Sequence, residues 1–324
     1  MKYALGNMLN GAGGLNPDGL SLDLQFALDK TLTARKGPTP TFTRASTATF
    51  VGSNGLIQSA AINAARFDHD PITLACKGLL IEEARTNLVF PSDTLTTQTR
   101  TVTAIAHTLS FYGTGTVVLS GAAIATVTGT GAYPTRTTLT FTPTAGSLIL
   151  TVTGSVTQAQ LETGSFATSY IPTTTAALTR SADICSITGA DFTGFYNQPE
   201  GTMIIHGDSA GSNGSRWCAT GPTRAFEILG KTTISYFESS GGTVNSIGSI
   251  SLPTKFGLAC KLNDFQGVRN GTLGGVDAIA TMPSPTALNI GSLLAPSDWL
   301  NGCIISLRYY KKRLPNAKLT QLTT

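Results

Sequence analysis

A strict alternation of threonine with apolar residues is the feature that most constrains what this chain can fold into. Over residues 148–153, Leu148, Leu150 and Val152 fall on one face, and the hydroxyls of Thr151 and Thr153 fall on the other. A half-buried antiparallel strand requires this period of two, whereas an amphipathic helix requires a period near 3.6. Similar runs separated by glycines predict a small β-sandwich over residues 92–178.

Length and composition extend this prediction to the whole chain. Only 12% of the 324 residues are charged, and 35 are glycine, which disfavours long surface helices and suits strands joined by tight turns. The length exceeds that of a usual single domain. We therefore expect an all-β fold: tandem antiparallel β-sandwiches of the jelly-roll type with an irregular N-terminal arm.

The expected organisation has four parts. The arm is rich in Gly, Asn and Pro, and holds one alternating stretch at 20–26. A lone strand is unstable, so we expect it to add to a sheet edge of a neighbouring subunit and dock the protein there. The predicted boundaries are 1–40 for the docking arm, 41–91 for an extended, turn-rich connection, 92–178 for the small sandwich and 179–324 for a larger jelly-roll sandwich.

The last part carries its own strand pattern. Asn270-Gly271 predicts a two-residue hairpin turn, and Pro315 opens a short C-terminal helix. The residues expected in its core are Leu258, Leu262, Ile305 and Leu307. Strands are expected near 202–206, 216–220, 225–229, 233–237, 255–262 and 303–310.

Cysteine usage and charge bear on the compartment and on partners. The 5 cysteines are widely spaced and form no CxxC pair, which favours buried free thiols of a protein made in a reducing cytoplasm. A net charge of +4 is small for this length, so no nucleic-acid partner is expected. No stretch approaches ~18 apolar residues, so neither membrane insertion nor secretion is expected.

Three groups of motifs resemble known families. Residues 42–49, 66–68, 78–82 and 85–88 resemble bacteriophage structural proteins. Residues 159–172 resemble the closing strand and exit of a carbohydrate-binding-module-like sandwich in tail-fibre and head-fibre proteins. Residues 288–291, 299–302 and 305–310 are similar to the end of concanavalin A-like (laminin G-like) jelly rolls, which makes a concanavalin A-like jelly roll the expectation for residues 179–324.

The resemblance implies a phage virion structural protein, a tail or head fibre that displays a lectin-like domain for adhesion to host surface glycans. It implies assembly in the host bacterial cytoplasm, location in the virion, and contacts with other virion proteins and with sister subunits, a trimer being the commonest arrangement. The alternative is a capsid or tail decoration protein that cements neighbours and binds no glycan. A polysaccharide-modifying esterase or glycosidase is the third.

Catalytic patterns are weak. Residues 204–209 resemble the nucleophile block of SGNH esterases, but none of the 3 histidines follows Ser209 to act as its base. The acids Glu227 and Glu238 stand apart, unlike the paired carboxylates of glycosidases. We therefore expect no enzymatic activity and no cofactor.

Metal ligation has little support as well. Asp68-His69-Asp70 is the densest group of ligand-type residues, and the adjacent Pro71 favours a turn. No metal ligands are predicted. Acidic residues in the loops leave open the alternative that the larger sandwich binds a Ca²⁺ ion.

Sugar binding needs an exposed aromatic ring with planar polar neighbours. Trp299 with Asp298 and Asn301 fits this best, and Trp217 with Asn213 comes second. The alternative for both tryptophans is packing in the core or at its rim.

Overall fold

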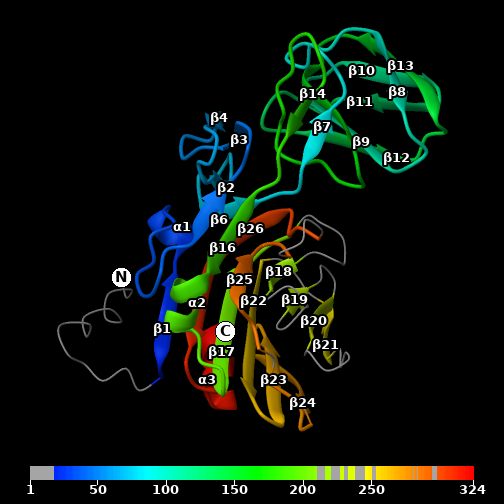
Figure 1. The fold of residues 1–324 in the computed structure, drawn as a ribbon. Coiled ribbons are helices and arrows are strands. Elements are labelled where there is room, and N and C mark those ends of the chain that lie inside the picture. Colours follow the sequence, from blue (N-terminus) through cyan, green and yellow to red (C-terminus); the bar gives the residue numbers. More distant parts are fainter. Residues whose placement is uncertain are drawn as a thin grey trace.

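The computed structural model describes residues 18–209, 216–219, 227–229, 233–237, 245–249, 253–279, 281–282, 284–293 and 298–324, and for residues 216–217, 227–229, 233–237 and 245–249 it describes the backbone alone. In this part of the chain the fold is all-β, as the alternating patterns predict. Two sandwiches lie end to end, the smaller at one end of the larger (Figure 1). No helix among the described residues is both long and apolar enough to span a bilayer.

The larger sandwich consists of two antiparallel sheets. The first is ordered β24 (Thr272–Asp277), β23 (Asp264–Arg269), β22 (Thr254–Lys261), β17 (Glu200–Gly207), β26 (Gly302–Tyr310), β6 (Cys76–Ile81) and β5 (Phe67–His69), and β1 (Leu20–Leu24) also pairs with β26. The second is ordered β2 (Thr41–Thr43), β16 (Ile184–Thr188), β25 (Ala287–Ile290), β18 (Arg216–Ala219), β19 (Glu227–Leu229), β20 (Thr233–Phe237) and β21 (Asn245–Ser249).

The smaller sandwich follows the threonine-rich segment. One sheet is ordered β11 (Ala125–Thr128), β10 (Thr116–Gly121), β13 (Gly146–Thr153) and β8 (Gln98–Val102), and the other β12 (Thr137–Phe141), β9 (His107–Tyr112) and β14 (Thr157–Thr163). Leu148 and Leu150 are fully buried in its core, and Ser147 and Ile149 beside them are exposed, as the alternation predicts.

Short elements complete the chain. They are the hairpin of β3 (Ala48–Val51) and β4 (Ile57–Ala60), the two-stranded ribbon of β7 (Arg85–Asn87) and β15 (Leu178–Arg180), and the helices α1 (Phe26–Asp29), α2 (Gly189–Phe195) and α3 (Asn316–Thr323). The ribbon joins the two strands that lead into and out of the small sandwich.

The larger sandwich is assembled from both sides of the smaller one. The structure corrects the expected boundaries here, because β1, β2, β5 and β6 belong to its sheets although they precede residue 92. Strand β1 pairs with the chain's own β26, in a register that sets Leu24 opposite Leu307. The lone strand thus finds its hydrogen-bond partners within its own chain, and a docking role for residues 1–17 lies outside the described residues.

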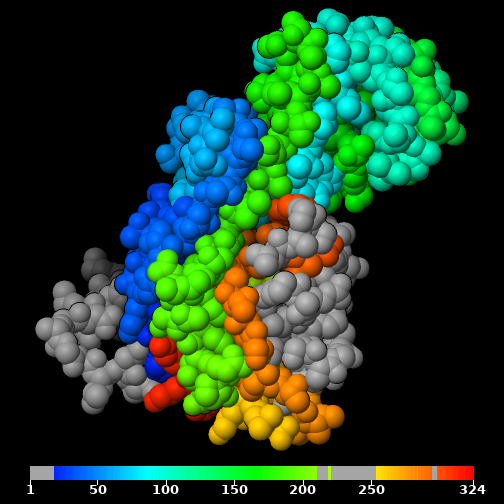
Figure 2. Space-filling model, viewed as in Figure 1, coloured from blue at the N-terminus to red at the C-terminus, as the bar shows by residue number. Residues whose placement is uncertain are grey.

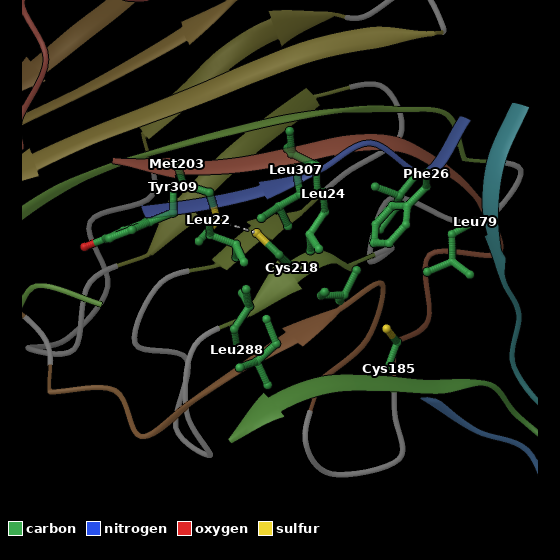
Figure 3. Close-up of a cluster of buried hydrophobic side chains, with 14 of the residues drawn as sticks. Leu22, Leu24, Phe26, Leu79, Cys185, Met203, Cys218, Leu288, Leu307 and Tyr309 are labelled. Atoms are coloured by element: carbon green, nitrogen blue, oxygen red, sulfur yellow. Dashed lines mark hydrogen bonds between the residues drawn. The ribbon is translucent and has the colours of Figure 1, made fainter. Parts of the chain in front are cut away.

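The main core lies between the two sheets of the larger sandwich. Leu22, Leu24 and Phe26 from the N-terminal segment are fully buried there, and Leu288 and Cys185 of the opposite sheet belong to the same cluster (Figure 3). Of the core residues predicted from sequence, Leu258 and Leu307 are buried. Leu262 is 58% exposed because it occupies the turn between β22 and β23.

Ile305 is the second core position that the alternation misplaces. It is half-buried, and Ile304 is fully buried instead. The pairing of β17 with β26 shifts register between His206 and Gly207, which sets Ile304 opposite Gly207. A one-residue shift exchanges the two faces of a strand, so a bulge defeats a prediction based on strict alternation.

Two predicted local features of the C-terminal region are present. Asn270 and Gly271 connect β23 to β24 with φ of 43° and 78°, the left-handed conformation that a tight hairpin turn needs. Helix α3 packs on the outer face of the first sheet, with Leu319 fully buried and Leu322 partly buried beside it.

The cysteines lie mostly in the interior. Cys185, Cys218, Cys260 and Cys303 are buried, Cys76 is half-buried, and all five are free thiols. Burial raises the pKa of Cys185 and of Cys260, which keeps both as neutral thiols at pH 7.

Leu307→Ala is expected to lower the free energy of unfolding by about 2 to 5 kcal/mol, the range for truncating a fully buried leucine. Leu262→Ala is the matched control, because that side chain is largely exposed, and it should change stability by less than about 0.5 kcal/mol. Urea unfolding of the two variants measures both values. Equal effects would show that the described register of β26 is wrong.

Candidate functional site

A cleft of about 390 Å³ lies where the small sandwich, the β3–β4 hairpin and the large sandwich meet. This volume falls within the range of small-ligand pockets. Its walls come from the β3–β4 hairpin, β5, β6, the segment after β14, the end of β17 and the start of β26. Segments far apart in sequence thus meet at one surface, beside the neck that joins the two lobes in Figure 2.

Three charged side chains line one part of the cleft. Lys77 Nζ lies 3.4 Å from Asp68 Oδ2, and Asp68 Oδ1 accepts a hydrogen bond from the Val51 amide at 2.8 Å. Asp208 Oδ1 accepts a hydrogen bond from the Cys303 amide at 2.8 Å. The backbones of β3 and β26 therefore hold both carboxylates in place.

The protonation of this group follows from its partial burial. Burial raises the pKa of the Asp68 carboxyl, and Lys77 and the Val51 amide oppose the rise. Burial works against the ammonium form of Lys77, but the side chains of Cys303, Asp68 and Asp208 around it raise its pKa well above the usual value. Lys77 is therefore a charged donor at neutral pH.

Aromatic and planar polar groups line the rest of the cleft. Phe166 is half-buried, with the Arg85 guanidinium 4.9 Å above its ring. Arg136 donates from Nη1 to the Thr168 carbonyl at 2.6 Å and from Nη2 to Ser110 Oγ at 2.8 Å. Its buried Nε has no hydrogen-bond partner among the described residues.

A buried carboxylate fixes the segment that carries Phe166. Glu162 is fully buried and accepts hydrogen bonds from the Thr168 amide at 2.9 Å and the Thr168 hydroxyl at 2.7 Å. Gln160 Oε1 accepts from the Ile171 amide at 2.6 Å. The motif at 159–172, quoted above for its resemblance to fibre proteins, therefore shapes one wall of the cleft.

Five buried charged side chains form a network beneath the cleft. Asp183 binds Arg44 at 3.2 Å and Arg66 at 2.5 Å, and Arg66 also binds Glu82 at 2.9 Å. Arg180 lies 3.5 Å from Glu82. Glu82 in turn accepts two hydrogen bonds from Ser169, at 2.7 Å each, and so ties the wall of the cleft to the large sandwich.

Neither this network nor the cleft was predicted from the sequence. Arg44, Arg66 and Glu82 lie in the motifs quoted for their resemblance to phage proteins, and their contacts are with Asp183, more than 100 residues on. The sequence did offer a chemical signal: charged residues occur within turn-rich, otherwise apolar segments, although only 12% of the residues in the chain are charged. Buried charges are rare unless paired.

Glu82 makes the stability of the network depend on pH. Burial alone would raise the pKa of Glu82, but Arg180, Arg66 and the Ser169 hydrogen bonds lower it to about 2 from its ordinary 4.5. A lowered pKa contributes stability above pH 4.5 that is lost as pH falls toward 2, here about 3 kcal/mol in total.

Glu82→Gln should therefore be least stable relative to the natural chain at pH 7, and this difference in the free energy of unfolding should narrow as pH falls from about 4.5 toward 2. Urea unfolding of both proteins across this range measures the difference. Glu83→Gln is the neighbouring control, because Glu83 is more exposed and pairs with Arg85 outside the network. A difference between Glu82→Gln and the natural chain that is constant with pH would contradict the assigned role.

The tryptophan site predicted from sequence takes a different form in the structure. Trp299 is half-buried against the main core, and its indole N–H donates to the Asp183 carbonyl at 3.0 Å. Asn301 is buried, lines the cleft, and accepts a hydrogen bond from the Glu83 amide at 2.9 Å. Asp298 is exposed and does not line the cleft. The structure thus brings only Asn301 of this group to the cleft, and sugar binding at Trp299 stays a prediction.

The second predicted pair cannot be placed. Asn213 lies outside the described residues, and for Trp217 only the backbone, in β18, is described. Of the acids weighed for glycoside hydrolysis, Glu227 is described by its backbone alone and Glu238 lies outside the described residues.

Ser209 is engaged in a structural hydrogen bond. It is 4% exposed, and its hydroxyl donates to the Leu300 carbonyl at 2.6 Å. A serine nucleophile needs a base that accepts this proton. The described part of the chain also holds no cluster of three or more His, Cys, Asp or Glu side chains placed to bind a metal.

Comparison with known proteins gives only weak likenesses. No family model matches the chain, and no curated protein sequence matches it. Among solved structures, it is similar to the CBM40 domain of the Ruminococcus gnavus IT-sialidase, bound to α2,3-sialyllactose (13% identity, 40% of this chain and 84% of that one, TM-score 0.34).

Two further structures show a similar level of likeness. They are the Trypanosoma rangeli sialidase with 2,3-difluorosialic acid (15% identity, 43% of this chain and 26% of that one, TM-score 0.35) and the binding domain of botulinum neurotoxin DC with SialylT (7% identity, 44% and 39%, TM-score 0.33). The chain spans about a quarter of the sialidase and well under half of the toxin chain. Likenesses this weak imply nothing about what the present chain binds.

Proposed function

We propose that this chain is an adhesive structural protein that binds a glycan in the cleft between its two sandwiches. The observation that carries the proposal is the cleft itself: about 390 Å³, lined by an aromatic ring, charged groups and amide and hydroxyl groups from both lobes. Sugars stack their C–H faces on aromatic rings, and their hydroxyls bond to planar polar groups.

The cleft offers these groups in a fixed arrangement. Phe166 supplies the ring, Lys77 supplies a charged donor, and Asp68 and Asp208 supply acceptors. The buried network and Glu162 hold these groups before ligand arrives, which reduces the entropy lost on binding.

Binding without turnover is part of the proposal. Both cleft carboxylates accept hydrogen bonds from backbone amides, those of Val51 and Cys303, and Asp68 also faces Lys77. We assign both carboxylates the role of fixed acceptors for sugar hydroxyls. The Ser209 hydroxyl is directed to a backbone carbonyl.

The biological setting we propose is a phage virion, as a tail or head fibre subunit joined to sister subunits and other virion proteins. The support is the resemblance of residues 42–49, 66–68, 78–82, 85–88 and 159–172 to phage proteins. Those motifs contribute Arg44, Arg66 and Glu82 to the buried network and part of the walls of the cleft.

Lys77→Met tests the binding site. A glycan array should show saccharides bound by the natural chain, and the variant should bind them roughly tenfold or more weakly, because it loses a hydrogen bond from a charged donor. Lys261→Met is the control, since Lys261 is exposed at the far end of β22 and does not line the cleft.

Phe166→Ala should weaken the same saccharides by removing the stacking surface, and thermal unfolding should confirm that every variant is folded. Equal glycan binding by the natural chain and both cleft variants would exclude the cleft as the binding site. An absence of glycan binding by the natural chain would favour the decoration role, and turnover of a bound polysaccharide would contradict binding without catalysis.

A further inference from the structure

The ammonium group of Lys77 is already matched by carboxylates on the wall of the cleft. Its Nζ lies 3.4 Å from Asp68 Oδ2, and its side chain is 42% exposed. Burial works against this ammonium group, but Cys303, Asp68 and Asp208 raise its pKa, so Asp208 also lies close to it. A ligand that reaches Lys77 therefore meets one cation together with two carboxylates.

The other charged groups that line the cleft are engaged with the protein. Arg136 donates from Nη1 to the Thr168 carbonyl and from Nη2 to Ser110 Oγ, and its Nε is buried. Glu82 is the third carboxylate of the lining, and it is paired with arginines of the buried network. Among the described residues, the lining thus offers no cation that is left without a carboxylate or another protein acceptor.

The two aspartates are held in a way that suits hydroxyl groups. Asp68 Oδ1 and Asp208 Oδ1 each accept a hydrogen bond from a backbone amide at 2.8 Å, which leaves Oδ2 of each for a ligand. A sugar hydroxyl donates to a carboxylate and accepts from an ammonium group, so it fits beside both. A sugar carboxylate has no proton to donate at pH 7, and it brings a third negative charge next to two others.

We propose that the cleft selects uncharged sugar rings and rejects rings that carry a carboxylate, such as those of uronic acids. Asp68 and Asp208 determine this specificity, because they receive sugar hydroxyls and repel a ligand carboxylate. The inference rests on the proposed function, and it adds the chemical class of the saccharide.

Binding titrations with matched saccharides test the selection. The probes are the neutral oligosaccharide that the array selects and the same oligosaccharide with its primary alcohols oxidised to carboxylates. The acid should bind roughly tenfold or more weakly, and added salt should narrow this gap by screening the repulsion. The matching amide keeps the size of the carboxyl group and removes its charge, so it should recover most of the loss.

Asp208→Asn and Asp68→Asn test the two residues. Each substitution keeps an oxygen for the backbone amide and removes one negative charge. Each should raise the binding of the acid relative to the neutral saccharide by roughly tenfold. Asp191→Asn is the control, since Asp191 is exposed on α2 and does not line the cleft, and it should leave this ratio unchanged. If Asp68→Asn does not fold, the half-buried Asp208 decides.

The outcomes separate this inference from the proposed function. An array on which only acidic saccharides bind, an acid that binds the natural chain as tightly as its neutral counterpart, or a ratio that neither Asn variant changes would overturn the inference and leave the cleft as a glycan site. An absence of binding by every saccharide would contradict the proposed function, and the inference with it.

Discussion

A chain that starts at Thr41 is expected not to fold. The deletion removes β1 and α1, and with them Leu22, Leu24 and Phe26, whose side chains are fully buried in the main core. Each such loss costs about 2 to 5 kcal/mol, and their sum reaches the whole stability of a typical protein, about 5 to 15 kcal/mol. The deletion also exposes the edge of β26 that β1 covers.

The matched control is a chain that starts at Asp18, which keeps every residue of β1 and of the core. Circular dichroism during heating should show a cooperative transition for this control and none for the chain that starts at Thr41, which should also aggregate. A cooperative transition of the shorter chain within a few degrees of the control would show that the N-terminal segment is a dispensable arm, as its composition suggests.

Asp183→Asn is expected to destabilise the protein by roughly 5 kcal/mol, the upper end of the range for breaking a buried ion pair. The substitution keeps the shape of the side chain and removes the charge that two buried arginines, Arg44 and Arg66, share. The five-residue network, which has three arginines and two carboxylates, is then left with three positive charges and one negative charge. Asp93→Asn is the control, because Asp93 is exposed.

Urea unfolding of the two variants measures the difference. A loss of less than about 1 kcal/mol for Asp183→Asn is what an exposed ion pair contributes. It would mean that the network positions these segments but does not stabilise the fold. We expect a second effect as well: the junction should become accessible to protease between residues 173 and 180, where the chain leaves the small sandwich.

Local patterns predicted the elements well where they obey simple periodicity. Strand β13, the turn at Asn270-Gly271 and helix α3 all follow from spacing and turn chemistry. Strict alternation failed at Ile305, where a bulge shifts the register, and at Leu262, where the strand has already turned.

Pairing between distant segments was beyond the sequence pattern. Strand β1 looks unpaired in sequence because its partner β26 lies almost 290 residues away, and nothing in a single sequence marks that contact. The same holds for the cleft, whose walls come from many segments, and for Asp183, which joins arginines more than 100 residues before it. Trp299 is a case in which a residue type misled the prediction. Tryptophan is rare in this chain and suits sugar binding, but the indole of Trp299 packs against the main core.

The most direct measurement of the central claim is a crystal structure of the chain with the saccharide that the array selects. We expect the sugar in the cleft, with a ring face on Phe166 and hydroxyls within hydrogen-bond distance of Lys77 and Asp208. A saccharide seated instead over Asp298 and Trp299, or anywhere on the surface of the small sandwich away from the junction, would contradict it.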